Sequence, residues 1–279
     1  MTGSQPDPRL DSVLVRRGLA RSRGRAVDLV RQGRVQVDGD IARKPSQPVP
    51  PPASVRVDGP GDGYVSRAAH KLRGALEELE VLAPGRLVVA GARCLDAGAA
   101  AGGFTQVLLE RGAAHVEAVD VGHGQLDPVL AADPRVTSRE GLNVRDLDRD
   151  LVGPVDLVVA DLSFISLAVV IGALVAVVAP GGSLLVMVKP QFEVGRARLG
   201  GSGVVTSPRL RAGTVVAVAE SAAAAGVGVR AVVPSPLPGS AGNREYFLWL
   251  APGEPGADLA EIVREAVDTG RPVLASGSR

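Results

Sequence analysis

Short apolar runs recur along residues 93–250 and alternate with segments whose apolar residues follow a helical spacing. Five runs have the length of a strand; they cover residues 93–96, 115–120, 136–140, 154–161 and 183–190. Strand-length runs that alternate with helices are typical of βαβ units with parallel strands. We therefore predict an α/β fold built on a Rossmann-like, doubly wound and mostly parallel sheet.

The same alternation continues toward the carboxyl terminus. It predicts a helix over 208–225, a strand over 227–233, a last, antiparallel strand over 244–250 and a closing helix over 256–268. The intervening stretch 191–206 is rich in glycine and predicts a mobile loop. Ser163 and Ser166, which follow the fourth run, are candidate caps for the next helix.

The first 57 residues follow a different pattern. Apolar residues between 10 and 14 predict a short amphipathic helix, and Ser22 is a suitable N-cap for a second one. Asp38-Gly39 between two short alternating runs predicts a hairpin, and a further strand is expected at 55–57. Together these elements indicate a small α+β module.

The stretch DGPGDG at 58–63 has the composition of a flexible linker. We therefore divide the chain into a small domain over 1–58 with flexible residues 1–8, a linker over 59–65, an α/β domain over 66–252, and a C-terminal helix and tail over 253–279.

Charge is distributed unevenly between these parts. The net charge is +1, yet residues 1–73 hold 14 Lys and Arg against 7 Asp and Glu. A basic front on an acidic body favours contact with a polyanion such as RNA, although a solvated charged surface would have the same composition. Cys94 is the only cysteine, so no intrachain disulfide and no cysteine-based metal site is expected. The absence of a signal-like or membrane-spanning run leads us to expect a cytoplasmic protein.

A glycine-rich turn follows the first strand of the sheet. The stretch RCLDAGAAAGGFT places Gly98, Gly102 and Gly103 between Asp96 and a new helix that opens at Phe104. Strand, glycine loop and helix together form a nucleotide-binding crossover. The spacing D-x-G-x-x-x-G-G suits S-adenosylmethionine better than a dinucleotide, which disfavours a dehydrogenase. A tight turn without a ligand is the alternative.

Polar residues stand at the ends of the later strands. Asp120 is placed to accept the ribose hydroxyls of an adenosine cofactor, and Asn143 is a candidate for its adenine edge or for a loop cap. Asp161 and Lys189 end two buried parallel strands and should meet at the ligand-binding edge of the sheet. Lysine is rare, since Lys71 and Lys189 are two of only three, which suggests that these positions require a primary amine.

Two resemblances add to this interpretation. The region from Arg9 to about Val57, with the pattern SRGRAVDLVRQGRVQVDG, resembles the S4-like RNA-binding domain. Its implied RNA-binding residues are Arg9, Arg21, Arg23, Arg25, Arg31 and Arg34. Such modules bind RNA by shape and phosphate contacts.

The chain from about Arg9 to Leu250 resembles the TlyA (haemolysin A) family of ribosomal RNA 2′-O-methyltransferases, whose catalytic domain is similar to FtsJ. The resemblance implies a class I methyltransferase fold, S-adenosylmethionine as cofactor, no metal, and cytidines of ribosomal RNA, within both ribosomal subunits, as substrate. The family's catalytic tetrad falls on Lys71 in SRAAHKL, Asp161 in VVADLSF, Lys189 in VKPQFEVG and Glu245 in NREYFLWL. Its cofactor positions fall on Gly102, Phe104, Asp120, Asn143 and Asp161, where Asn143 replaces the acid that FtsJ has.

The role of Lys189 stays open at this stage. It acts as a general base if burial and the charge of Lys71 remove its proton, or as an orienting ammonium if Asp161 and Glu245 prevail. Two other functional classes are a membrane-active haemolysin, which would need an amphipathic or spanning segment, and an RNA-binding factor without catalysis.

Overall fold

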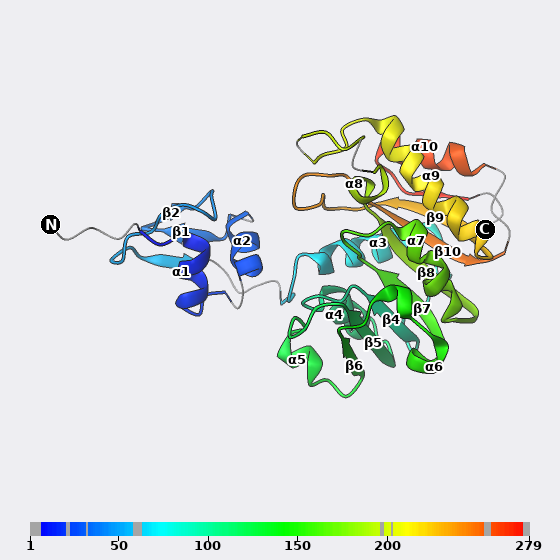
Figure 1. The fold of residues 1–279 in the computed structure, drawn as a ribbon, viewed down its shortest axis with the longest axis horizontal. Coiled ribbons are helices and arrows are strands. Elements are labelled where there is room, and N and C mark those ends of the chain that lie inside the picture. The colour runs from blue at the N-terminus through cyan, green and yellow to red at the C-terminus, as the bar shows by residue number, and fades with distance from the viewer. Residues whose placement is uncertain are drawn as a thin grey trace. The chain divides into compact units, whose positions relative to one another are not determined.

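A computed structural model divides the chain into two compact units, residues 1–67 and 68–279 (Figure 1). The structure describes residues 7–20, 23–31, 33–57, 63–195, 198–201, 203–253 and 258–275. Ser22, the expected N-cap, lies outside these residues, as do residues 1–6 of the expected flexible start and residues 58–62 of the expected linker.

Among its described residues, the first unit contains two helices and a three-stranded sheet: α1 (Leu10–Arg16), α2 (Arg23–Arg31), β1 (Val35–Val37), β2 (Asp40–Ile41) and β3 (Val55–Val57). β1 is central and pairs antiparallel with both neighbours. Asp38 and Gly39 form the β1–β2 turn with φ of 53° and 92°, as a tight hairpin requires. Buried aliphatic residues, among them Leu10, Leu14 and Val35, form a separate small core.

The second unit is built on eight strands: β4 (Arg93–Ala97), β5 (His115–Asp120), β6 (Val136–Glu140), β7 (Val155–Ala160), β8 (Val178–Val188), β9 (Val227–Pro234), β10 (Tyr246–Pro252) and β11 (Val273–Leu274). Their order is β11-β9-β10-β8-β7-β4-β5-β6. Strands β4 to β8 are parallel to their neighbours in that group, and β10 is antiparallel to both β8 and β9. The predicted mostly parallel sheet and its antiparallel strand are confirmed.

The helices of this unit are α3 (Ala68–Leu82), α4 (Gly103–Glu110), α5 (Pro128–Ala131), α6 (Arg149–Val152), α7 (Leu167–Ala176), α8 (Pro190–Glu193), α9 (Pro208–Ala224), α10 (Leu259–Thr269) and the 3₁₀ turn η1 (Val144–Asp146). α9 packs against α7 and α10, and these three helices share one apolar core with the sheet. α3 and α4 pack against each other, and Phe104 of α4 stacks on Phe247 of β10. Since Phe247 alternates with Leu248 of that core, α4 covers the opposite face of the sheet (Figure 1).

Three details differ from the sequence prediction. The expected loop 191–206 begins inside a helical turn, α8. The strand at 246–252 is not the last, because β11 follows the closing helix and pairs with β9. Ser166 caps α7 by accepting a hydrogen bond from Ala168 N, whereas Ser163 caps no helix and contacts Lys189 instead. The reason is that the loop after β7 turns Ser163 toward the end of β8.

Candidate active site

Two buried ion pairs lie at the carboxyl end of β8. Lys71 Nζ on α3 is 2.5 Å from Glu245 Oε2, which directly precedes β10. Lys189 Nζ, directly after β8, is 2.5 Å from Asp161 Oδ1, directly after β7. The carboxyl ends of parallel strands meet at one sheet edge, so β7 and β8 bring the second pair together.

Contacts along β8 and its extension join the two pairs. Lys71 Nζ lies 3.8 Å from Met187 Sδ, two residues before Lys189. Gln191 Nε2, two residues after Lys189, donates to Glu245 Oε1 at 3.2 Å. The four residues that sequence motifs singled out therefore share one end of the sheet, arranged as two acid–lysine pairs.

Lys189 also contacts the hydroxyl of Ser163 and the ring of Phe192. Its Nζ donates to Ser163 Oγ at 2.9 Å and lies 5.9 Å from the centre of the Phe192 ring. Asp161 Oδ1 is buried and lies 2.5 Å from Lys189 Nζ, so the two side chains form a close ion pair. An ammonium has three donors. With one directed to Ser163 and one side facing Asp161, Lys189 can still donate a hydrogen bond to a further oxygen.

The glycine loop passes close to this edge. Gly98 has φ of 87°, and a Cβ there would lie 2.8 Å from the carbonyl oxygen of Asp161. Gly102 is the N-cap of α4 with φ of 92°, and a Cβ there would lie 2.4 Å from Leu130 Cδ1. Gly103 begins α4. Only glycine fits the first two positions, because their positive φ and the close neighbouring atoms leave no room for a side chain.

Asp96 and Asp120 stand on either side of this loop. Asp120 accepts hydrogen bonds from Ala100 N at 2.9 Å and Gly122 N at 2.7 Å. A carboxylate has about four lone-pair positions, so ribose hydroxyls can still donate to it. A small cavity of about 10 Å³ borders Asp120, and Gln125 lies directly against Gly122 there. A nucleoside therefore requires Gln125 to move.

Asp96 is completely buried. Its Oδ2 accepts from Thr105 N and Thr105 Oγ1, while Oδ1 has no hydrogen-bond partner among the described residues. Burial raises the pKa of Asp96 to about 7, against the opposing effect of the hydrogen bonds from Thr105. S-adenosylmethionine carries ribose hydroxyls and cationic groups. The glycine loop at 98–103, the Asp120 carboxylate at the end of β5 and the unpartnered oxygen of Asp96 fit such a ligand.

Phe104 and Asn143 have additional local roles. The Phe104 side chain is 2% exposed and packs on Phe247 with ring centres 6.0 Å apart, so only its backbone can face a ligand. Asn143 Oδ1 accepts from Arg145 N and caps η1, which is the loop-cap alternative considered for it. An adenine contact by Asn143 would therefore use its amide nitrogen.

Sequence patterns did not single out several residues that shape this edge. Gln191 donates a hydrogen bond to Glu245 and so orients its carboxylate. Asn243 fixes the loop before α9, because its side chain accepts from Val205 N and donates to Gly203 O. Arg211 is buried and donates to Tyr246 Oη and Thr206 O. Gln191 and Asn243 each lie two residues from a member of the tetrad, and this closeness in sequence is the signal by which they could have been found.

The predicted RNA-binding arginines belong to the first unit. Arg9 donates to Asp11 with an Nη2–Oδ2 distance of 2.8 Å and thereby lowers the pKa of Asp11. Arg23 donates to Ser12 Oγ at 3.0 Å, and Arg31 is exposed. Arg34 is half-buried. Arg21 and the side chain of Arg25 lie outside the described residues.

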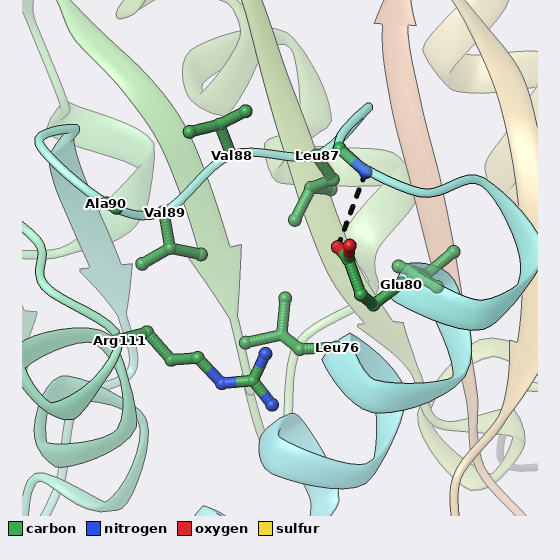
Figure 2. A pocket seen from close by; sticks show the side chains of 9 residues that line it. Leu76, Glu80, Leu87, Val88, Val89, Ala90 and Arg111 are labelled. Carbon is green, nitrogen blue, oxygen red and sulfur yellow. Dashed lines mark hydrogen bonds between the residues drawn. The ribbon is translucent and has the colours of Figure 1, made fainter.

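A separate cavity of about 250 Å³ opens where α3 ends and β4 begins, far along the sheet from the glycine loop (Figure 2). Aliphatic residues line most of it, and Arg111 and Glu80 are its charged residues. Glu80 Oε2 accepts from Gly85 N at 3.5 Å. None of the residues predicted for the site lines this cavity.

Within the described ranges, no three His, Cys, Asp or Glu side chains are grouped as metal ligands. Within the same ranges, no helix is both long and apolar enough to cross a bilayer.

Two family models match the chain. The model described as FtsJ-like methyltransferase matches residues 64–251, and the model described as S4 domain matches residues 8–52. The chain is 51% identical over 264 residues to the 16S/23S rRNA (cytidine-2′-O)-methyltransferase TlyA of Mycobacterium tuberculosis. The matched region covers 93% of this chain and 95% of that relative.

Other relatives carry two kinds of names. A 23S rRNA (cytidine-2′-O)-methyltransferase TlyA of Campylobacter jejuni is 30% identical, over 67% of this chain and 70% of its own. Hemolysin A of Brachyspira hyodysenteriae is 31% identical, over 86% of this chain and 98% of its own. A solved structure from Streptococcus thermophilus that carries a hemolysin name has a TM-score of 0.72 and 32% identity, covering 95% of this chain and 97% of that one.

Proposed function

The chain belongs to the FtsJ-like methyltransferase family, as its motifs indicated, and from that premise we propose that it methylates the ribose 2′-hydroxyl of cytidines in ribosomal RNA. The names of the relatives from Mycobacterium tuberculosis and Campylobacter jejuni support this substrate. The first of these names includes both 16S and 23S rRNA and supports action on both ribosomal subunits. Such a substrate implies a cytoplasmic enzyme.

One observation carries the proposal: the two buried ion pairs, Lys71–Glu245 and Lys189–Asp161, share one end of β8 beside the glycine loop. Two lysines in a largely buried site can hold an oxygen nucleophile without a metal. Their paired carboxylates offset the cost of burying both ammonium groups.

S-adenosylmethionine, when bound, supplies an electrophilic methyl group. Gly98, Gly102 and Gly103, with the backbone of Phe104, would hold it. Asp120 would bind its ribose, and Asn143 and Asp161 would complete the contacts. Support comes from the absence of side chains at Gly98 and Gly102, where a Cβ would collide with Asp161 O and Leu130.

Lys189 would bind the acceptor hydroxyl. Methyl transfer is an in-line displacement that depends chiefly on holding the oxygen about 3 Å from the methyl carbon. Lys189 Nζ lies 2.5 Å from the Asp161 carboxylate and donates to Ser163 Oγ; as an ammonium with a third N–H it would donate to the acceptor hydroxyl and orient it, and the hydroxyl proton would leave late. Of the two roles that the sequence left open for Lys189, the orienting role is the one proposed here.

Lys71, on α3, and Glu245, directly before β10, would support the same step. Glu245 is fixed by two donors, Lys71 Nζ at 2.5 Å and Gln191 Nε2 at 3.2 Å. A carboxylate held on both sides keeps its orientation as substrate enters. The pair then presents a fixed ammonium and carboxylate next to the acceptor ribose.

The S4 unit would bind the RNA. Arg9, Arg21, Arg23, Arg25, Arg31 and Arg34 are its proposed phosphate contacts. Lowered affinity for ribosomal RNA in charge-removing variants of Arg23 and Arg31, with a reduced salt dependence, would support this role.

The test is methylation of purified 30S and 50S subunits with methyl-labelled S-adenosylmethionine, followed by mapping of 2′-O-methyl nucleotides. Label at cytidine ribose in both subunits is the expected result. Cofactor binding by calorimetry without any label in RNA would contradict the proposed reaction and favour an RNA-binding factor without catalysis.

A further inference from the structure

Three separate contacts join the segment after β7 to the segment after β8. Lys189 Nζ reaches Asp161 and Ser163, at 2.5 and 2.9 Å. The rings of Phe164 and Phe192 lie 5.2 Å apart at 51°. Glu193 makes the third contact and lies at the far end of α8.

The Glu193 carboxylate closes the start of α7. Its Oε2 accepts from Ser166 Oγ at 2.6 Å and its Oε1 from Leu167 N at 2.8 Å. Ser166 is the N-cap of α7, and its Oγ also accepts from Ala168 N. A carboxylate is favoured at a helix N-terminus because free N–H groups and the helix dipole both attract it. Burial raises the pKa of Glu193, while these hydrogen bonds lower it.

The loop between these anchors needs such support. Residues 161–166 connect the buried end of β7 to α7, whose Leu167 and Val170 are buried in the main core. Phe164 within this loop has φ of 64° and is 91% exposed. A left-handed conformation is costly for a bulky residue, and burial does not offset that cost here. Contacts from outside the loop must therefore maintain its shape.

We propose that Glu193 is a positioning residue for methyl transfer: by binding Ser166 and Leu167 it fixes the loop that sets Asp161 and Ser163 against Lys189. The inference rests on the proposed function only in assigning Lys189 to the acceptor hydroxyl. Glu193 touches neither reacting atom. It acts by setting the distance between residues 161–166, after β7, and residues 189–193, after β8.

The first test measures how accessible Lys189 is and does not depend on catalysis. The chain has three lysines, Lys44, Lys71 and Lys189, so their reactivity toward reductive methylation can be followed separately by mass spectrometry. In Glu193→Gln the negative charge is lost, and the group that faces Ser166 Oγ becomes a donor, so the serine hydroxyl must accept where it now donates. We expect Lys189 to react about threefold faster relative to exposed Lys44, with Lys71 unchanged.

The matched control is Asp148→Ala, which also removes a carboxylate that caps a helix. Asp148 caps α6 through Asp150 N, at the opposite end of the strands from Lys189. We expect this variant to leave Lys189 reactivity unchanged. Equal reactivity of Lys189 in the parent and in Glu193→Gln would overturn the positioning role.

The second test separates the kinetic constants. Glu193→Gln should lower kcat about tenfold while the cofactor Kd changes less than kcat, because Gly98, Gly102 and Asp120, which supply most of the proposed cofactor contacts, lie outside the loop that Glu193 holds. Glu193→Asp, which keeps two acceptors, should recover part of kcat. A kcat equal to that of the parent in Glu193→Gln would contradict the inference. An inactive parent that still shows the Lys189 labelling difference would instead disprove the proposed function and leave the positioning role standing.

Discussion

Lys71 and Glu245 are separated by 174 residues, yet their side chains form an ion pair of 2.5 Å in which each is at most 8% exposed. α3 supplies the lysine, and the residue directly before β10 supplies the acid. The pair therefore ties the first helix of the catalytic unit to its antiparallel strand. A structural role and a proposed catalytic role meet at this contact.

Breaking this pair should destabilise the protein. Glu245→Gln leaves a buried ammonium without its counter-charge, and Lys71→Met leaves the carboxylate alone; each is expected to cost about 3 kcal/mol of unfolding free energy. The double variant should regain most of that loss because no unpaired charge remains. Urea unfolding measures all three. Single variants that cost less than about 1 kcal/mol would show that water screens the pair.

A side chain at position 239 should not be tolerated, because Gly239 packs directly against Glu245. A Cβ at Gly239 would lie 2.4 Å from Glu245 Oε1 and 3.1 Å from its Cδ. We expect Gly239→Ala to turn the carboxylate away from Lys71 and Gln191, with methyl transfer lowered about tenfold or more and the fold retained. Labelled-methyl transfer and circular dichroism check the two outcomes.

Gly213→Ala is the matched control for that variant. Gly213 lies in α9, and a Cβ there would meet no atom within 4 Å. This change should leave activity unaltered and raise stability by about 1 kcal/mol, since alanine favours the helix. Full activity in Gly239→Ala would mean that Glu245 does not need its present orientation.

Asp96 should give the protein a pH-dependent stability. Its pKa is about 7 in the folded chain against 3.8 for the free group, because burial disfavours the charged form. The folded state therefore holds this proton more tightly than the unfolded state between these values. Stability from this group is fully present below about pH 4 and falls as pH rises toward 7, by about 4 kcal/mol at most.

Asp96→Asn removes this titrating group, so a comparison of the parent with the variant isolates its contribution to the free energy of unfolding. The unfolding free energy of the parent minus that of the variant should decrease between about pH 4 and pH 7 and stay level above. Urea unfolding at several pH values provides the comparison. A difference that is constant with pH would contradict the raised pKa.

The sheet and the place of the site followed from sequence because both depend on local patterns. Apolar runs that end in Asp161 and Lys189 predicted adjacent strand ends, and the structure has β7 and β8 side by side. The glycine spacing after Asp96 predicted a sharp turn, and Gly98 and Gly102 adopt positive φ. Strand ends and glycine turns are encoded within a few residues.

The pairing inside the site could not be predicted in this way. Which carboxylate faces which lysine depends on how α3 packs near β10, a contact between distant segments. Ser163 looked like a helix cap because serine has that propensity, but the loop directs it to Lys189. The hydrogen bonds of Glu193 likewise depend on the packing of α8 against the start of α7.

In the proposed function, Lys189 holds the acceptor hydroxyl during methyl transfer to ribosomal RNA. The most direct measurement is labelled-methyl transfer to 30S and 50S subunits by the parent, Lys189→Arg and Lys189→Ala, with cofactor binding measured in parallel. We predict that Lys189→Ala lowers transfer about 100-fold or more with cofactor affinity retained, and that Lys189→Arg keeps part of the activity because it still donates a hydrogen bond. Transfer by Lys189→Ala at the rate of the parent would contradict the claim.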